Sequence, residues 1–315
     1  MYVAIVTGAT GQDGSYMCEH LVSKGYDVKC LVRKDVHYDT VECYHGDILD
    51  YSSVYNLISK CLEYERIEIY NLAAKVHTGS PLETFEVNTS GIHNILEAVK
   101  HLNIQSKCRI CQASSSEMFG NAREVPQNEN TPFHPRTVYG VSKVAAHWLV
   151  RNYRESNGLY VCSAILYNHE SPRRSDIYVT QKIVKGLKLG ECFHIGNLES
   201  RRDWGHAKDY VEAMWLMLQP DAPDDYVIAT GTTHSVRDFI EIVATKMCKN
   251  ISWSGEGVDE VGIIDGKIAI KVSKEFYRPC EEYPLVGDPS KILSIGWSRR
   301  YDIHSIVDDM LDSIH

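Results

Sequence analysis

The sequence opens with Val3-Ala4-Ile5-Val6-Thr7-Gly8-Ala9-Thr10-Gly11-Gln12-Asp13-Gly14, an apolar run that leads directly into a glycine-rich loop. The β-branched run at 2–6 predicts a strand, and residues 14–23 after the loop predict a helix. Glycines let a backbone turn tightly and approach an anion closely, and amides at a helix start attract that anion. Between a strand and a helix, this loop indicates dinucleotide binding, although ordinary tight turns also use glycine.

Strand and helix signals alternate through the first half of the chain. Strands are predicted at 2–6, 27–32, 67–73, 108–113 and 159–166, with helices at 14–23, 51–62, 80–100 and 137–156. Alternation at this spacing implies a parallel sheet with helices on both faces. We therefore predict an α/β fold, a Rossmann-type doubly wound parallel sheet with a smaller C-terminal domain.

The pattern changes after residue 167. Helices are predicted at 177–189, 206–219, 235–246 and from about 303, with short strands at 192–195 and 227–229 and a looser stretch at 252–274. We expect a dinucleotide-binding domain at 1–168, to which about 204–234 returns, and a smaller interleaved domain at 169–315.

Composition excludes several classes of protein. The 315 residues include 33 Lys and Arg against 42 Asp and Glu, a net charge of −9, and this mean field argues against nucleic-acid and anionic-membrane partners. No apolar run approaches the roughly 18 residues of a membrane helix, and we expect no signal peptide. The ten cysteines stand mostly singly in apolar runs, so we expect reduced thiols in a cytoplasmic protein.

One cysteine pair has the spacing of a metal or redox site. Cys108 and Cys111 lie in a predicted strand, where residues three apart point to opposite faces. We therefore expect core packing and no metal site.

The end of the second predicted strand bears on the choice of cofactor. An acidic residue there binds a ribose 2′-hydroxyl, whereas a cation accommodates a 2′-phosphate. The strand ends Val32-Arg33-Lys34-Asp35, and a planar guanidinium suits phosphate. We predict NADP with Arg33 as a ligand, and Asp35 on the hydroxyl is the alternative.

Tyr139 and Lys143 are four residues apart on one face of a predicted helix. A nearby ammonium favours the phenolate and lowers the pKa of the tyrosine, which would make Tyr139 a general base for an alcohol that loses hydride. The run Ser114-Ser115-Ser116-Glu117 ends a predicted strand, where open α/β sheets place their ligands.

The glycine loop, the serine run and the Tyr/Lys pair together resemble the extended short-chain dehydrogenase/reductase superfamily. Residues 166–174 (LYNHESPRR) and 201–218 (RRDWGHAKDYVEAMWLML) are similar to the GDP-mannose 4,6-dehydratase family almost residue for residue. The resemblance extends over nearly the whole chain, to the YRP at 277–279. It implies an NADP-binding domain at 1–168, a nucleotide-sugar-binding domain at 169–315, and GDP-mannose as the substrate.

The resemblance implies a redox-neutral reaction. Tyr139 would take the proton of the mannose 4-hydroxyl as hydride leaves C4, and Lys143 would hold the phenolate. Glu117 would remove the C5 hydrogen, made acidic by the new 4-ketone, and help to expel the 6-hydroxyl as water. Ser115, where the family usually has threonine, would bond the developing oxyanion. Hydride would return to C6 and give GDP-4-keto-6-deoxymannose.

Further site residues follow from the same resemblance. Those expected at the cofactor are Gly8, Gly11, Gln12, Asp13, Gly14, Arg33, Asp47, Ile48, Leu72, Ala73, Ala74, Tyr139 and Lys143; Asp47 could instead cap a helix. Those expected at the nucleotide sugar are Asn168 and Lys182 on the diphosphate side, Arg202 and Arg278 on the phosphates, and Glu281 on the guanine edge.

The chain departs from the family after Arg33. It reaches Tyr44 in a few polar residues, in place of a longer Arg/Ser-rich loop used for cofactor binding and tetramer assembly. We therefore expect a homodimer built on the helices at about 81–100 and 137–156. Lys75 and Val76 also stand where the family commonly has glutamine and serine.

A shorter loop would ease NADPH exchange, and a side reduction of the 4-ketone to GDP-rhamnose, as some relatives perform, is an additional hypothesis, although no residue in the sequence marks a reductase. The alternatives are a nucleotide-sugar 4-epimerase or a 4-ketoreductase. Neither reaction couples removal of the C5 proton to loss of water, so neither needs the carboxylate of Glu117. A dinucleotide sensor without turnover is a further alternative, and such proteins tend to lose the Tyr/Lys pair.

Overall fold

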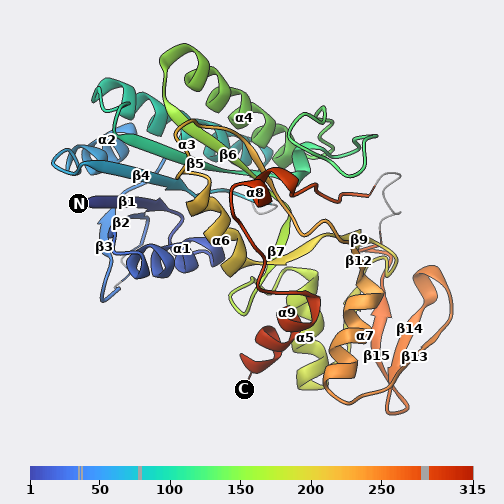
Figure 1. Ribbon diagram of the computed structural model, residues 1–315. Coiled ribbons are helices and arrows are strands. Elements are labelled where there is room, and N and C mark those ends of the chain that lie inside the picture. The colour runs from blue at the N-terminus through green and yellow to red at the C-terminus, as the bar shows by residue number, and fades with distance from the viewer. Residues whose placement is uncertain (35, 37, 77–79, 278–283, 315) are drawn as a thin grey trace.

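The structure is a computed structural model that describes residues 1–34, 36, 38–76, 80–277 and 284–314 (Figure 1). Its centre is a seven-stranded sheet in the order β11-β6-β5-β4-β1-β2-β3, in which every pair of neighbours is parallel. In Figure 1, α2, α3 and α4 lie above this sheet, and α1 and α6 lie below it. The predicted α/β class with a Rossmann-type parallel sheet is confirmed.

Most predicted elements of the first half are present, with ends displaced by a few residues. The strands are β1 (Tyr2–Thr7), β2 (Asp27–Val32), β3 (Glu42–His45), β4 (Arg66–Asn71), β5 (Cys108–Ser115), β6 (Tyr160–Leu166) and β11 (Tyr226–Ile228). The helices are α1 (Gln12–Ser23), α2 (Tyr51–Ser59), α3 (Pro81–His101), α4 (Val138–Asn157) and α6 (Ala207–Leu216), with the short turn η1 (Ser116–Met118) after β5.

Two apolar layers hold the helices to the sheet. Cys111 lies in the layer that packs α1 and α6, and Cys108 lies in the layer that packs α2, α3 and α4. The two cysteines therefore face opposite sides of β5, as strand geometry requires. Among the described residues there is no group of three or more His, Cys, Asp or Glu placed to hold a metal ion.

Local signals fix the helices that border the site. Ser80 and Glu83 form a capping box at the start of α3, with Pro81 in the first turn. The Thr137 hydroxyl accepts the amide of Gly140 at the start of α4, and that helix ends at Gly158 with φ 64°.

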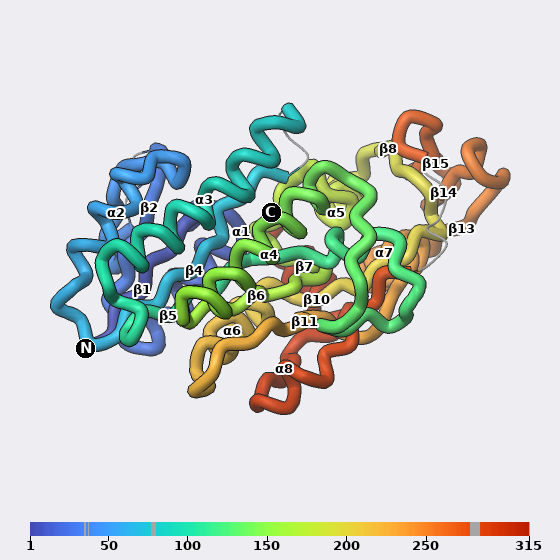
Figure 2. Tube along the Cα trace, turned by 90° about the horizontal axis from the view of Figure 1, so that it is seen from above, coloured from blue at the N-terminus to red at the C-terminus, as the bar shows by residue number. Residues whose placement is uncertain are grey.

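The remaining elements form the lower part of Figure 1, apart from α8, which contacts β11 (Figure 2). The helices are α5 (Val179–Leu189), α7 (Val236–Lys246), α8 (Ser290–Ser294) and α9 (Ile303–Asp312), with the turn η2 (Gly257–Asp259). The strands are β7 (Asn168–Glu170), β8 (Phe193–Ile195), β9 (Arg201–Arg202), β10 (Trp204–His206), β12 (His234–Ser235), β13 (Ile251–Ser254), β14 (Val261–Ile264) and β15 (Lys267–Val272).

The prediction of a looser stretch at 252–274 is wrong, because β13, β14 and β15 form an antiparallel meander that β8 extends. An irregularity between Gly262 and Ile263 breaks the two-residue alternation by which strands are recognised. The Asp265-Gly266 pair did signal the turn, because Asp-Gly is typical of tight hairpins. Both residues have positive φ, as such a turn requires.

Within the part of the chain that the structure describes, no helix combines the length and apolar character needed to cross a membrane.

Candidate active site

A cavity of about 460 Å³ opens where β1, β4, β5 and β6 end. The carboxyl edge of a parallel sheet is where open α/β folds bind their ligands. The cavity is lined by Gly8, Thr10, Gly11, Gln12, Asp13, Gly14, Leu72, Ala74, Val76, Ala113, Ser114, Ser115, Ser116, Glu117, Tyr139, Lys143, Leu166, Tyr167, Asn168, His169, Arg173, Arg174, Ser175 and Tyr178.

Backbone contacts require the glycines of the loop. A Cβ on Gly8, which has φ +69°, would lie 2.7 Å from the Ala73 nitrogen, and a Cβ on Gly14 would lie 2.1 Å from the Gly8 carbonyl oxygen. The N-cap of α1 is Gly11, which makes no side-chain cap bond, so the loop leaves the helix start accessible to an anion. The residues present fit the pyrophosphate of a dinucleotide.

The other residues expected at the cofactor divide into two groups. Leu72 and Ala74 line the cavity, whereas the Ala73 amide donates to the Thr7 hydroxyl at 3.1 Å. The cavity lining does not include Arg33, Asp47 or Ile48. Arg33 is exposed at the end of β2, Asp47 accepts the amide of Leu49 in a local turn, and Ile48 is buried in the core. Asp35 lies outside the described residues.

The Tyr/Lys pair faces the cavity from the first turns of α4. Lys143 Nζ donates to the carbonyl of Ala113 at 2.7 Å and lies 5.6 Å from the centre of the Tyr139 ring. Burial lowers the pKa of Lys143 to about 8. Burial also raises the pKa of Tyr139, although a hydrogen bond with Ser115 opposes this.

The prediction that Lys143 lowers the pKa of Tyr139 is therefore wrong for the protein by itself. Sequence spacing places the ammonium near the phenol, but it does not report that the site buries both groups. Desolvation then disfavours the charged form of each.

Ser115 and Glu117 complete the predicted catalytic set in the same cavity. The Ser115 hydroxyl, at the end of β5, accepts the Glu117 amide at 3.2 Å and so caps the turn η1. A Cβ on Gly140 would lie 2.6 Å from the Glu117 carbonyl oxygen, so glycine there lets α4 approach this turn closely. The structure thus brings all four predicted catalytic residues together.

Sequence reasoning missed His169, which is bonded on both ring nitrogens. Nδ1 donates to the Tyr167 carbonyl at 2.7 Å, and Nε2 donates to the Asp13 carboxylate, 2.9 Å from each oxygen. Burial opposes a charge on the ring, but Asp13 outweighs it and raises the pKa of His169. The imidazolium compensates a carboxylate that would otherwise repel an anion at the glycine loop.

Further bonds join the glycine loop and α1 to the segment after β7. Gln12 Nε2 donates to the His169 carbonyl at 3.1 Å, and the Ser171 hydroxyl donates to Gln12 Oε1 at 2.8 Å. Arg173 donates to the hydroxyl of Ser15 at 2.9 Å.

Arg174, which also lines the cavity, stacks 3.6 Å from the Tyr178 ring centre. The motif at 166–174 carried the signal for these residues, but spacing alone does not show which of its side chains face the loop.

The residues expected at the nucleotide sugar are only partly gathered here. Asn168 lines the cavity, whereas Lys182 on α5 lies 4.7 Å from the Phe276 ring centre, and neither Lys182 nor the half-buried Arg202 on β9 lines it. Arg278 and Glu281 lie outside the described residues.

The residues that follow 278–283 are held by hydrogen bonds to distant parts of the chain. Gln127, which is buried, donates to the carbonyls of Pro284 and Val286 at 3.1 and 2.9 Å. The carboxylate of Asp203, next to Arg202, accepts the Gly287 amide at 3.3 Å. These bonds fix the chain directly after residue 283 against β9 and the loop that contains Gln127.

Comparison with known proteins gives matches over nearly the full length. Residues 5–310 match the family described as GDP-mannose 4,6 dehydratase. The chain is 41% identical to the GDP-mannose 4,6 dehydratase of Drosophila melanogaster, over 98% of this chain and 85% of that protein. It is also 41% identical to the human GDP-mannose 4,6 dehydratase, over 98% of this chain and 90% of that protein.

Solved structures with the same fold are more distant in sequence. The UDP-glucose 4-epimerase of Thermus thermophilus, in complex with NAD, matches with a TM-score of 0.79 at 21% identity, over 99% of this chain and 98% of that chain. The dTDP-glucose 4,6-dehydratase of Bacillus anthracis, in complex with NAD, matches with a TM-score of 0.78 at 17% identity, over 99% and 96% of the two chains.

Proposed function

The chain belongs to the GDP-mannose 4,6-dehydratase family, and we propose that it converts GDP-mannose to GDP-4-keto-6-deoxymannose and water. The enzyme is a lyase. The observation that carries the proposal is one cavity that holds Ser115, Glu117, Tyr139 and Lys143 beside the glycine loop.

The glycine loop fits a nicotinamide dinucleotide, which when bound would accept a hydride and return it in the same turnover. The phenolic oxygen of Tyr139 takes the proton of the substrate 4-hydroxyl, and the neighbouring Lys143 ammonium stabilises the phenolate that this requires. The Ser115 hydroxyl donates to the oxygen at C4 as it becomes a carbonyl, where negative charge develops in the next step.

Glu117 carries out the dehydration. Its carboxylate takes the C5 hydrogen as a proton, and the electron pair forms a C5–C6 double bond as the C6–oxygen bond breaks. The same proton then leaves with the hydroxyl as water. When C6 regains the hydride, C5 takes one proton, which balances the proton that Tyr139 took from the 4-hydroxyl. Because Glu117 and Tyr139 line the same cavity, the two groups can serve adjacent carbons of one sugar.

We propose NADP as the dinucleotide, with Arg33 on the 2′-phosphate. Support comes from the exposed guanidinium at the end of β2, the strand next to the one that enters the glycine loop. Arg33→Gln should weaken NADP⁺ binding roughly tenfold, the loss of about one charge-assisted hydrogen bond, and leave NAD⁺ binding unchanged. Equal effects on both dinucleotides would show that Arg33 does not read the phosphate.

We assign the cofactor to residues 1–168 with about 204–234, and the nucleotide sugar to the interleaved part at 169–315. In this assignment Asn168, Lys182, Arg202 and Arg278 bind the diphosphate and Glu281 binds guanine.

We also propose a homodimer through α3 and α4, which pack against each other. Their surfaces expose Phe85, Val141 and Trp148 to 40%, 46% and 53%, apolar area that a second copy would cover.

The test is to incubate the purified protein with GDP-mannose and no added reductant and to analyse the product by mass spectrometry. The proposal expects a product lighter by one water, whereas an epimerase would give an isomer of unchanged mass. Tyr139→Phe should abolish turnover, and Glu117→Gln should retain GDP-mannose binding but lose water formation. Tyr51→Phe, which removes a phenol bonded to His101 at the C-terminal end of α3, is the matched control.

Failure of the wild-type protein to release water from GDP-mannose would overturn the proposal. If Glu117→Gln formed water at the wild-type rate, Glu117 would not be the C5 base. Equal turnover of dTDP-glucose and GDP-mannose by the wild-type protein would overturn the assignment of Glu281 to guanine.

A further inference from the structure

Gln127, in the loop between η1 and α4, connects this loop to two other parts of the chain. The residue is fully buried, and its side-chain amide makes four hydrogen bonds, which uses both N–H groups and both lone pairs of the oxygen. Nε2 donates to the carbonyls of Glu124 at 2.7 Å and Pro284 at 3.1 Å. Oε1 accepts the Tyr167 hydroxyl at 2.8 Å and the Val286 amide at 3.0 Å.

The backbone of Gln127 adds a second set of bonds to the same distant segment. Its amide donates to the Val286 carbonyl at 2.9 Å, and its carbonyl accepts the Asp288 amide at 2.8 Å. The loop and the segment 284–288 therefore run side by side, to the right of α8 in Figure 1. Backbone and side chain of one residue thus hold the whole of this segment.

This segment packs directly behind the wall of the cavity. Leu285 is buried in one apolar cluster with Met118 and Tyr167. Met118 belongs to η1, the turn that also holds Glu117, and Tyr167 lines the cavity. A Cβ on Gly287 would lie 2.8 Å from a ring carbon of Tyr167, so the segment and the ring are in close contact. A shift of the segment would therefore move the wall that faces the substrate.

We propose that Gln127 is a positioning residue that sets the affinity for the nucleotide sugar, because it holds the segment 284–288 against the cavity wall at Tyr167. The inference rests on the proposed function of the same site. The segment belongs to the part at 169–315 that we assign to the nucleotide sugar, whereas Gln127 belongs to the dinucleotide-binding part. Gln127 does not line the cavity, so its effect reaches the substrate through Tyr167 and this segment.

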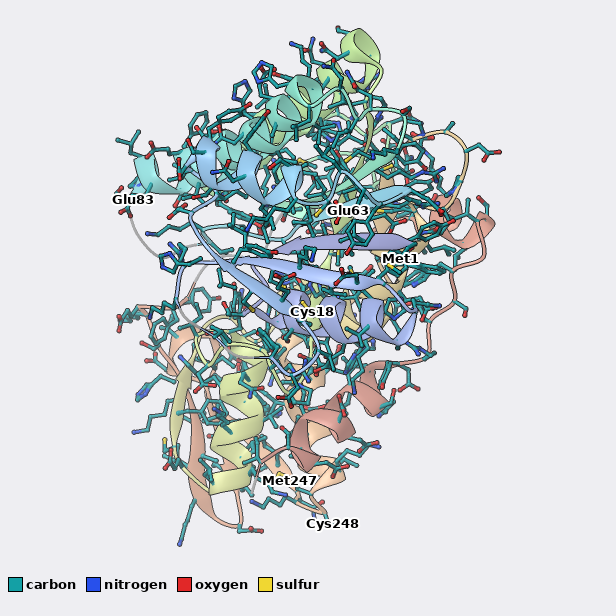
Figure 3. All side chains as sticks on the ribbon, turned by 90° about the vertical axis from the view of Figure 1, so that its left-hand side faces the viewer. Met1, Cys18, Glu63, Glu83, Met247 and Cys248 are labelled. Atoms are coloured by element: carbon teal, nitrogen blue, oxygen red, sulfur yellow. The ribbon has the colours of Figure 1, made fainter. Side chains whose placement is uncertain are left out.

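Binding of the dinucleotide should not depend on these bonds. The hydrogen bonds of Gln127 to described residues reach Glu124, Tyr167 and the segment 284–288, and none of them reaches the glycine loop or α1, the helix that carries Cys18 in Figure 3. A general loss of stability would weaken the binding of both ligands, whereas a loss of positioning would weaken that of the nucleotide sugar alone.

Two variants remove different parts of this arrangement. Gln127→Leu removes all four side-chain bonds, and Tyr167→Phe removes only the bond from the phenol and keeps the ring. The matched control is Thr131→Val in the same loop. It removes a buried hydroxyl that accepts the Asn128 amide at 3.0 Å and donates to the Glu124 carboxylate, and it leaves the bonds of Gln127 in place.

Titration calorimetry with GDP and with NADP⁺ measures both affinities without turnover. The dissociation constant for GDP should rise roughly tenfold in Gln127→Leu and roughly threefold in Tyr167→Phe, on the scale of one buried hydrogen bond. The constant for NADP⁺ should stay within about twofold of wild type in both variants, and Thr131→Val should retain both constants. In turnover, kcat/KM for GDP-mannose should fall mainly through a higher KM.

Unchanged GDP affinity in Gln127→Leu or in Tyr167→Phe would overturn the inference, and so would equal weakening of GDP and NADP⁺ binding or an equal loss in Thr131→Val. If Gln127→Leu does not fold, Tyr167→Phe decides by the same criteria. Binding of GDP by a wild type that releases no water from GDP-mannose would refute the proposed function and leave the calorimetric comparison intact. A wild type that does not bind GDP would overturn both.

Discussion

Replacing Lys143 by methionine tests how strongly the fold disfavours a positive charge in the wall of the cavity. Lys143 is 2% exposed, and burial lowers its pKa from 10.5 to about 8. Because the unfolded chain binds this proton more tightly, the charged lysine costs the folded protein roughly 3 kcal/mol at pH 7, at about 1.4 kcal/mol per unit of pKa.

The sign of the pH dependence follows from the same shift. Below pH 8 both folded and unfolded chains carry the proton, and the full cost is present. Between about pH 8 and 10.5 the folded chain loses the proton first, so the cost declines and stability rises with pH. The free energy of unfolding of wild type, minus that of Lys143→Met, should increase by roughly 1 kcal/mol from pH 7 to pH 9.

Chemical denaturation of the protein without added nucleotides measures this difference, since bound ligand would itself add stability. Lys188→Met, at an exposed position on α5, is the control, and its difference from wild type should stay constant over the same pH range. A constant or falling difference for Lys143→Met would refute the reasoning that burial governs this lysine.

Four further predictions concern the cofactor, the assembly and a side reaction. His169→Gln should weaken NADP⁺ binding, measured by titration calorimetry, because Asp13 loses its charged partner. Adding Asp13→Asn to this variant should restore part of the affinity. Unchanged affinity in His169→Gln would contradict the charge compensation. Binding of NADP⁺ to wild type should also weaken as pH rises through the raised pKa of His169, since the imidazolium is then lost. Light scattering should find a dimer, and Trp148→Glu should yield monomers, because it places a charge on the exposed face of α4, whereas a tetramer that persists on dilution would rule out this assembly. Excess NADPH added with GDP-mannose should give some GDP-rhamnose with matching loss of NADPH absorbance, and constant NADPH beside accumulating 4-keto product would rule out the side reduction.

Local patterns in the sequence were sufficient for the parallel α/β core. The apolar strand and glycine loop at 2–14, the Ser80–Glu83 capping box and Gly158 each act within a few residues, so their structural effect can be recognised in the sequence. The meander of β13 to β15 was missed because an irregularity at Gly262 and Ile263 interrupts the alternation that identifies strands.

The four proposed catalytic residues were also accessible from the sequence, because Ser115 and Glu117 share a strand end and Tyr139 and Lys143 share a helix face. Their protonation was not, since the pKa of Lys143 depends on burial, a property of the whole fold.

Contacts between distant segments were decided by tertiary structure alone. Asp13 and His169 are 156 residues apart, and Gln127 and Pro284 are 157 apart, so no spacing rule relates them. The sequence by itself determined which side chains are available for the chemistry and on which elements they stand. Only the packing of the loop before α4 against the segment 284–288, and of the segment after β7 against the glycine loop, decided which of them are charged, paired and held in place, because those properties arise from burial and long-range hydrogen bonds.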